Sequence, residues 1–218
     1  MKIRILSFLA ALSLTASAAE PVPLFNGKDL TGWTTADGKP VTAGWVVADG
    51  GVLHRASKGG DLYTAKEFGD FELTFDWKIA PAGNSGVKYR VTAYEKKGLL
   101  GPEYQLLDDE KHPDSKVGPQ RQTASLYDFT APDATLKKLN PPGEWNTTKI
   151  VARGTKFEHW LNGVRVLEMD TASESWKAAH AKSKFKGVPA FAQNARGRIL
   201  LQDHGDEIWF RNMTIREL

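Results

Sequence analysis

The chain has 218 residues, of which 41% are hydrophobic and 25% charged, and its formal net charge is +3. This length is enough for one ordinary domain with a hydrophobic core. The chain has no cysteine, which excludes disulfides, thiolate metal sites and a lipid-modified cysteine, so we do not expect a lipoprotein.

The first 18 residues have the three parts of a secretory signal peptide in the usual order. Lys2 and Arg4 make a basic start, an apolar run covers residues 5–14, and small residues precede a cleavage point at about Ala18. The run is shorter than the roughly 20 apolar residues of a membrane span, and a buried N-terminal helix is the alternative. We predict a signal peptide in residues 1–18, one domain in residues 19–218, and a secreted or periplasmic protein.

Removal of residues 1–18 also changes the charge, because Lys2 and Arg4 are the only charged residues there. The net charge then falls from +3 to +1. A nearly neutral domain without a dense basic stripe argues against binding to nucleic acid. No second long apolar segment follows, so we expect no membrane span.

The rest of the chain is dominated by a period of two, which is typical of β-strands with one buried face. Asn162-Gly163, between two apolar runs, predicts a tight hairpin. Ser173 precedes a short helical pattern that would extend to about Ala181. Many short strands and little helix predict an all-β, two-sheet antiparallel jelly-roll sandwich with one short helix. The expected strands or hairpins cover residues 44–54, 71–77, 87–91, 149–152, 157–167, 198–202 and 208–215.

Two of these segments place polar side chains on one face of a sheet. Lys88 and Arg90 would point outward from one strand, and Glu103 and Gln105 would share a face of another. If the strands are neighbours, the four side chains face the same space, which suits a sugar-binding surface or acid/base chemistry. A solvated face or a cross-strand salt bridge is the alternative.

A third segment lies near the C-terminus, where Gln202 and His204 share a face. Gly205 follows His204 and leaves the backbone free to orient the ring. Asp203 and Asp206 flank the histidine, and either could orient it, although a structural histidine is the alternative. Asp108 begins a long polar loop, which it could brace.

Sequence motifs exclude several common enzyme classes. No G-x-S-x-G, P-loop or dinucleotide-binding glycine motif is present, which argues against a serine hydrolase, an NTPase and a nicotinamide enzyme. Five histidines and no cysteine offer little to a dedicated transition-metal site, so we predict no metal and no cofactor. The acidic residues Asp108 and Asp109 leave a structural calcium ion open, without the spacing of an EF-hand loop.

Several sequence blocks occur in the order of a known family. They are LFNGKDLTGW, GNSGVKYR, GPEYQLLDD with the following His-Pro-Asp, ASLYDFTAP, PPGEWN, FEHWLNG and QDHGDEIWFRNMTIREL. With these blocks the chain resembles the 3-keto-disaccharide hydrolase family from about Pro23 to Leu218. The resemblance implies a concanavalin A-like sandwich and activity on glycosides whose glucose C3 has been oxidised to a ketone by a partner dehydrogenase. Lys88 departs from the pattern, because many relatives carry an aromatic or apolar residue there.

We therefore predict a hydrolase that cleaves 3-keto-glycosides by eliminating the C1 group and rehydrating the product. Glu103 and His204 are the predicted acid/base residues, and Arg90 is the predicted donor to the C3 oxygen. The other predicted substrate-binding residues are Lys88, Gln105, Gln202, Asp203, Asp206 and Asp108. A non-catalytic, lectin-like carbohydrate-binding module is the main alternative.

Overall fold

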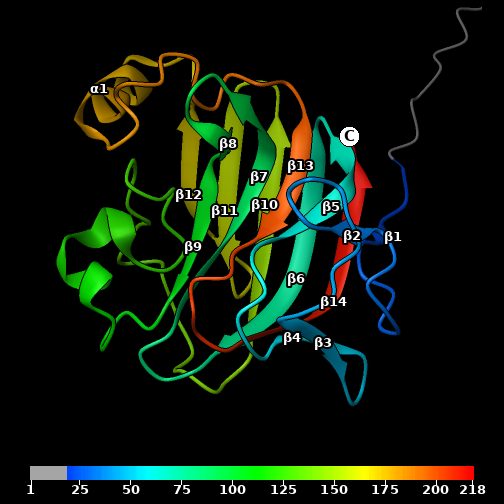
Figure 1. Cartoon of the computed structure of the whole chain (residues 1–218). Helices are drawn as coiled ribbons and strands as arrows, with labels where there is room; N and C mark the ends of the chain where they lie inside the picture. The colour runs from blue at the N-terminus through cyan, green and yellow to red at the C-terminus, as the bar shows by residue number, and fades with distance from the viewer. Residues whose placement is uncertain (1–18) are drawn as a thin grey trace, which may run out of the picture.

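A computed structural model describes residues 19–218, and the predicted signal peptide lies outside the described residues. The described residues form two antiparallel β-sheets packed face to face, with one α-helix at the side (Figure 1). This arrangement confirms the prediction of a two-sheet antiparallel sandwich with one short helix. No helix in residues 19–218 is both long and apolar enough to cross a bilayer.

The larger sheet has eight strands and the smaller has six. In spatial order the larger contains β12 (Val164–Asp170), β11 (Lys156–Leu161), β10 (Asn146–Arg153), β6 (Phe71–Ile79), β14 (Ile208–Glu217), β4 (Val52–Arg55) and β3 (Trp45–Ala48), and β1 (Val22–Pro23) pairs with β14. The smaller contains β2 (Trp33–Thr34), β5 (Leu62–Phe68), β13 (Gly197–Leu201), β7 (Asn84–Tyr94) and β8 (Gly98–Leu100), and β9 (Glu103–Leu107) also pairs with β7.

The core lies between the two sheets, as the alternation in β6 predicts. Every second residue of β6, from Phe71 to Ile79, is buried, and the residues between them are partly exposed. Phe75 of β6 meets Tyr104 of the smaller sheet edge to face, with ring centroids 6.5 Å apart. Each such buried aromatic stabilises the sandwich by about 2 kcal/mol relative to an exposed side chain.

Two local predictions are confirmed. Asn162 and Gly163 both have positive φ, 48° and 84°, which is the backbone of a two-residue hairpin turn between β11 and β12. Ser173 caps the helix α1 (Glu174–Lys182), because its Oγ accepts a hydrogen bond from the backbone N–H of Trp176 at 3.1 Å.

Strand β7 contains a bulge that the period of two does not reveal. Tyr89 and Arg90 of β7 together lie opposite the single residue Ile199 of β13, and Arg90 has φ 47°. The bulge reverses the alternation, so Val91 does not point inward as its spacing from Val87 suggests. It packs on the outer face of the smaller sheet.

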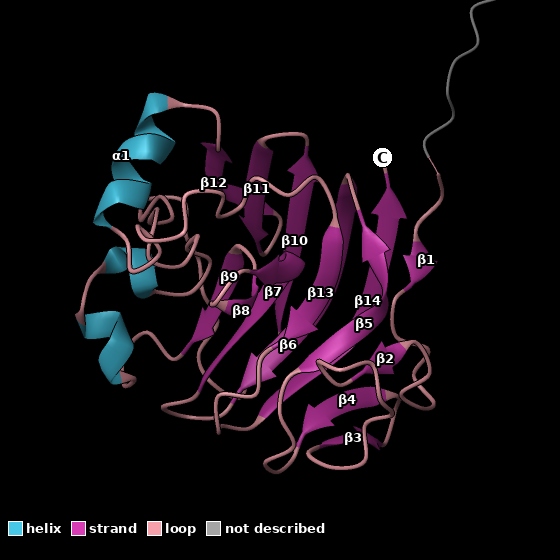
Figure 2. Ribbon diagram, turned by 45° about the horizontal axis from the view of Figure 1, so that its top comes forward, coloured by secondary structure: helices cyan, strands magenta, loops and turns pink. Residues whose placement is uncertain are grey.

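The long loop that begins at Asp108 contains two 3-10 turns, η1 (Pro113–Lys116) and η2 (Pro119–Arg121). Figure 2 shows α1 and these turns on one side of the sandwich, next to β12 and β9. The irregular segments are therefore gathered on the side of the sandwich where β12 and β9 lie, and they can wall a cavity there.

Candidate active site

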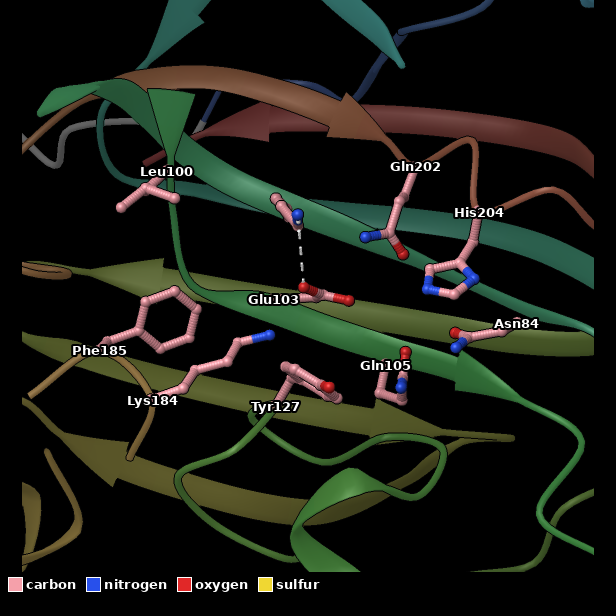
Figure 3. Close-up of a pocket in the computed structure, with 10 residues that line it drawn as sticks. Asn84, Leu100, Glu103, Gln105, Tyr127, Lys184, Phe185, Gln202 and His204 are labelled. Carbon is pink, nitrogen blue, oxygen red and sulfur yellow. Dashed lines mark ion pairs between the residues drawn. The ribbon is translucent and has the colours of Figure 1, made fainter. Parts of the chain in front are cut away.

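A polar cavity of about 310 Å³ lies on the outer face of the smaller sheet. Glu103 and Gln105 point into it, whereas Tyr104 and Leu106 between and after them point into the core, so the alternation in β9 separates the two environments. The cavity is lined by Asn84, Lys88, Leu100, Glu103, Gln105, Tyr127, Lys184, Phe185, Gln202 and His204 (Figure 3).

Glu103 is the buried carboxylate of this cavity, with only 7% of its surface exposed. It pairs in register with Lys88 on β7, and the Lys88 Nζ lies 3.6 Å from its Oε2. Burial raises the pKa of Glu103 above its usual value of 4.5, although the charges of Lys88, Lys184 and His204 oppose the shift. A carboxylate with a raised pKa is suited to accept a proton near neutral pH.

Lys184 adds a second cation from the loop between α1 and β13. Its Nζ lies 4.3 Å from the centre of the Tyr127 ring, so the ammonium faces an aromatic surface. Burial lowers the pKa of Lys184, and the nearby carboxylate of Glu103 partly restores it. Burial raises the pKa of Tyr127 to a value that keeps its hydroxyl protonated.

A stack of aromatic rings fixes the loop that carries Lys184. Phe185 lies against Phe191 with ring centroids 4.2 Å apart and against Phe129 at 5.6 Å. Phe129 in turn lies on Trp176 of the helix at 4.5 Å. The helix, whose cap the sequence predicts, therefore positions a cavity residue through this stack.

Three amides supply neutral hydrogen-bonding groups. Gln105 is held in place, because its Oε1 accepts from the Leu106 N–H at 3.2 Å. Asn84 is 4% exposed, and its Oδ1 has no hydrogen-bond partner among residues 19–218. A buried acceptor without a partner is costly, so this atom is suited to accept a hydrogen bond from a ligand hydroxyl. Gln202 lies beside His204, just after the end of β13, and both also line the cavity (Figure 3).

His204 stands at the edge of the cavity, beside His112 and Asp206. One potential ligand atom from each of these three residues lies within 4.8 Å of the others, an arrangement that could hold a transition-metal ion. However, His112 Nδ1 accepts a hydrogen bond from the Asp114 N–H at 3.1 Å, so the proton of the neutral ring is on Nε2. Because a metal ligand must offer an unprotonated nitrogen, His112 would have to break this bond to bind an ion.

Arg90 does not reach the cavity, contrary to its predicted position. The bulge directs its side chain to the end of the sandwich, where only 2% of it is exposed and it pairs with Asp70 at 2.8 Å. Its guanidinium also donates to the carbonyls of Gly69 and Gly154, and lies 5.5 Å from the centre of the Phe157 ring. Arg90 is therefore placed to join loops, and it does not belong to the lining of the cavity.

The three weaker candidates, Asp203, Asp206 and Asp108, lie outside the cavity lining. The Asp206 carboxylate accepts the backbone N–H of Asn84 at 2.9 Å. The Asp108 carboxylate accepts backbone N–H groups of Ala82, Glu110 and Lys111, so it braces the start of the long loop. Burial alone would raise the pKa of Asp203, but hydrogen bonds from Gly59 and Gly60 and the charge of Arg55 lower it.

Five lining residues were not predicted from the sequence: Asn84, Leu100, Tyr127, Lys184 and Phe185. Tyr127 lies within the family block ASLYDFTAP, which could have drawn attention to it. Lys184 and Phe185 belong to no quoted block and no periodic pattern. Lys184 reaches the cavity because its backbone N–H donates to Asp128, a residue 56 positions earlier, at 2.6 Å.

A two-sheet sandwich with a polar cavity, a buried carboxylate and two lysines on its outer face has the architecture of a carbohydrate-active jelly-roll enzyme. Comparison with known proteins narrows this class. Residues 20–216 match the family described as the 3-keto-alpha-glucoside-1,2-lyase-like domain. The chain belongs to this family, and it is a hydrolase that acts on glycosides.

Individual relatives agree with this assignment. The chain is 35% identical to a 3-keto-disaccharide hydrolase of Bacteroides thetaiotaomicron, and the match covers 95% of this chain and 82% of the relative. A Parabacteroides distasonis crystal structure, provisionally described as a glycosyl hydrolase, has a TM-score of 0.80 and 36% identity, covering 89% of this chain and 92% of that one. The β-glucanase of Bacillus licheniformis has a TM-score of 0.51 at 10% identity over 94% of this chain and all of its own, and shows the jelly-roll fold alone.

Proposed function

We propose that the protein cleaves 3-keto-glycosides by removing the C2 proton, expelling the group at C1 and adding water to the unsaturated sugar. Two similarities support the 3-keto substrate: the family is described as the 3-keto-alpha-glucoside-1,2-lyase-like domain, and the Bacteroides relative is a 3-keto-disaccharide hydrolase. The chemistry itself is supported by the composition of the cavity.

The single observation that carries the proposal is that Glu103 is the only carboxylate among the cavity-lining residues in the described part of the chain. Ordinary glycosidases use two carboxylates that flank the glycosidic bond. Asp203 cannot supply the second, because its carboxylate already accepts three backbone N–H groups and pairs with Arg55. An elimination needs only one base at C2, and Glu103 fits that requirement.

The ketone at C3 makes the C2 proton acidic, because its removal leaves an enolate. Glu103 takes this proton. Burial raises its pKa, so its carboxylate is a stronger base than an exposed glutamate would be. The electron pair then forms the C1–C2 double bond as the C1–oxygen bond breaks. Water adds back across this bond, and no covalent intermediate with the protein is formed.

The developing negative charge on the C3 oxygen needs a cation or a hydrogen-bond donor. Lys88 and Lys184 take the role predicted for Arg90, since both ammonium groups are near Glu103 in the cavity and Arg90 is elsewhere. The two amides of Gln105 and Gln202 and the free Oδ1 of Asn84 can bind the sugar hydroxyls.

The proposal also defines the reaction that comes before. A glycoside has a hydroxyl at C3, so an oxidation that removes two hydrogens from C3 must supply the substrate. A sugar 3-dehydrogenase is the class of enzyme that performs it, and it would act upstream of this protein.

The test compares a 3-keto-glucoside, the same compound with deuterium at C2, and the unoxidised glucoside. We expect cleavage of the keto compound alone, with slower turnover or loss of deuterium to water. A lectin-like module would bind the sugars without turnover. If the label stays fully in the product and the rate is unchanged, direct displacement at C1 replaces elimination.

A further inference from the structure

A second cavity, of about 590 Å³, adjoins the first at His204. One wall comes from Arg55 at the end of β4 and from Ser57, Lys58 and Gly60 after it. The other comes from residues 203–205, which follow β13. His204 lines both cavities, whereas Glu103 lines only the first. A ligand that extends from one cavity into the other must therefore pass His204.

Asp203 holds the two walls together. Its carboxylate accepts the backbone N–H groups of Gly59 and Gly60 at 2.9 and 2.8 Å and pairs with Arg55 Nη2 at 2.7 Å. Arg55 Nη1 donates to the carbonyl of Gly205 at 2.6 Å. These bonds join loops almost 150 residues apart in the chain, so the second cavity is largely formed before a ligand enters.

Apart from two glycines, the residues that line the second cavity have polar or charged side chains, which suit a hydroxylated ligand. Apart from His204 the lining contains no aromatic ring on which a flat aglycone could stack. It offers the Ser57 hydroxyl, the Lys58 ammonium and Arg55, whose Nε is buried and has no hydrogen-bond partner in residues 19–218. Such donors match the hydroxyls of a sugar better than the apolar surface of an aryl group.

We propose that the second cavity binds the leaving group, a second sugar, and that His204 protonates the leaving oxygen. The inference rests on the proposed function. With the 3-keto ring beside Glu103 and the leaving sugar in the second cavity, the bridging oxygen lies next to His204. Glu103 removes the C2 proton, the C1–oxygen bond breaks, and protonated His204 gives its proton to the departing oxygen, which leaves as an alcohol.

The acid role of His204 is tested by varying the leaving group. 4-Nitrophenolate leaves without protonation, whereas methoxide does not, so His204→Ala should slow the methyl 3-keto-glucoside by at least about a hundredfold and the 4-nitrophenyl one by less than about tenfold. Glu103→Gln is the matched control and should slow both alike. Equal losses on both substrates in His204→Ala would overturn the acid role.

The binding role of the second cavity is tested with Ser57→Trp, which fills it from an exposed position. The kcat/KM for a 3-keto-disaccharide, relative to that for the methyl 3-keto-glucoside, should fall at least about tenfold, which corresponds to about 1.4 kcal/mol. Ala56→Trp changes the adjacent exposed residue, which lies outside the lining, and should leave the ratio as it is.

The possible failures are distinguishable. If the unchanged protein cleaves both keto substrates and Ser57→Trp leaves their ratio unaltered, the leaving-group site is wrong and the proposed function stands. If the unchanged protein cleaves neither, the proposed function is wrong and this inference falls with it.

Discussion

Glu103 combines two properties that oppose each other in a folded protein. Its carboxylate is buried, which disfavours the charged form, yet Lys88 and Lys184 are close enough to favour it. The outcome is a pKa above the usual 4.5, so the folded state binds this proton more tightly than the unfolded chain does. The contribution of Glu103 to stability is therefore largest below its usual pKa of 4.5. It decreases as the pH rises through the raised pKa of the folded state.

The decrease in stability with rising pH can be tested with Glu103→Gln, which removes the charge and keeps the shape of the side chain. Activity should fall at least about a hundredfold, because the base is lost. The melting temperature of the variant minus that of the unchanged protein should be larger at pH 8 than at pH 4. Thermal unfolding of both proteins at the two pH values measures this difference. A difference independent of pH would contradict the raised pKa.

Gly86 leaves the space that the Glu103 carboxylate occupies. It lies on β7 opposite Gln105, and a Cβ added there would come 2.9 Å from Glu103 Cδ and still closer to Oε1. Its φ is not positive, so alanine can adopt the backbone, and the conflict is with the side chain alone.

We expect Gly86→Ala to lower activity about ten- to a hundredfold by displacing Glu103, because small misplacements of reacting groups are costly. The fold should be retained, as judged by circular dichroism. Gly187→Ala is the control, since an added Cβ there meets nothing within 4 Å. Equal effects of the two substitutions would mean that the space at Gly86 is not needed.

At the scale of elements, the bulge in β7 separates two basic residues that appear equivalent in the sequence. Lys88 precedes the bulge and lines the cavity, whereas Arg90 within it joins the loops that carry Asp70 and Gly154. The pairing of β7 with β13 decides this difference, because one residue of β13 must face two of β7.

Arg90→Met should therefore destabilise the protein without removing a catalytic group. Loss of the buried ion pair and hydrogen bonds should cost about 3 kcal/mol in the free energy of unfolding, measured by denaturant titration. The kcat/KM of the folded variant should stay within about threefold of the original, a change of under about 1 kcal/mol. Arg153→Met, at an exposed position at the end of β10, is the control. A hundredfold loss of activity at unchanged stability would restore the catalytic role predicted for Arg90.

At the scale of the whole molecule, the predicted signal peptide remains to be tested. In the described residues the first strand, β1, begins at Val22. We expect the exported protein to lack residues up to about Ala18, and intact-mass measurement decides this. A mature protein that retains Met1 would contradict the prediction of export by this route.

The sequence alone was sufficient where structure depends on neighbours in the chain. The alternation in β7 before its bulge and in β9 predicted which side chains point outward, and the structure places Lys88, Glu103 and Gln105 in the lining of one cavity. Asn162-Gly163 and the Ser173 cap were predictable for the same reason, because their geometry is set within a few residues.

Contacts between distant segments decided the rest. The bulge that removes Arg90 from the cavity exists only when β7 pairs with β13, more than 100 residues later. Lys184 enters the cavity through a stack of rings from four separate positions and a hydrogen bond to Asp128. Asp203 was predicted to bind the substrate, but its carboxylate accepts the backbone N–H groups of Gly59 and Gly60 instead. The residues in each of these contacts are much farther apart in the chain than the few residues that a strand alternation or a turn involves. Local sequence patterns therefore could not predict them. They are brought together only when the two sheets and their loops pack.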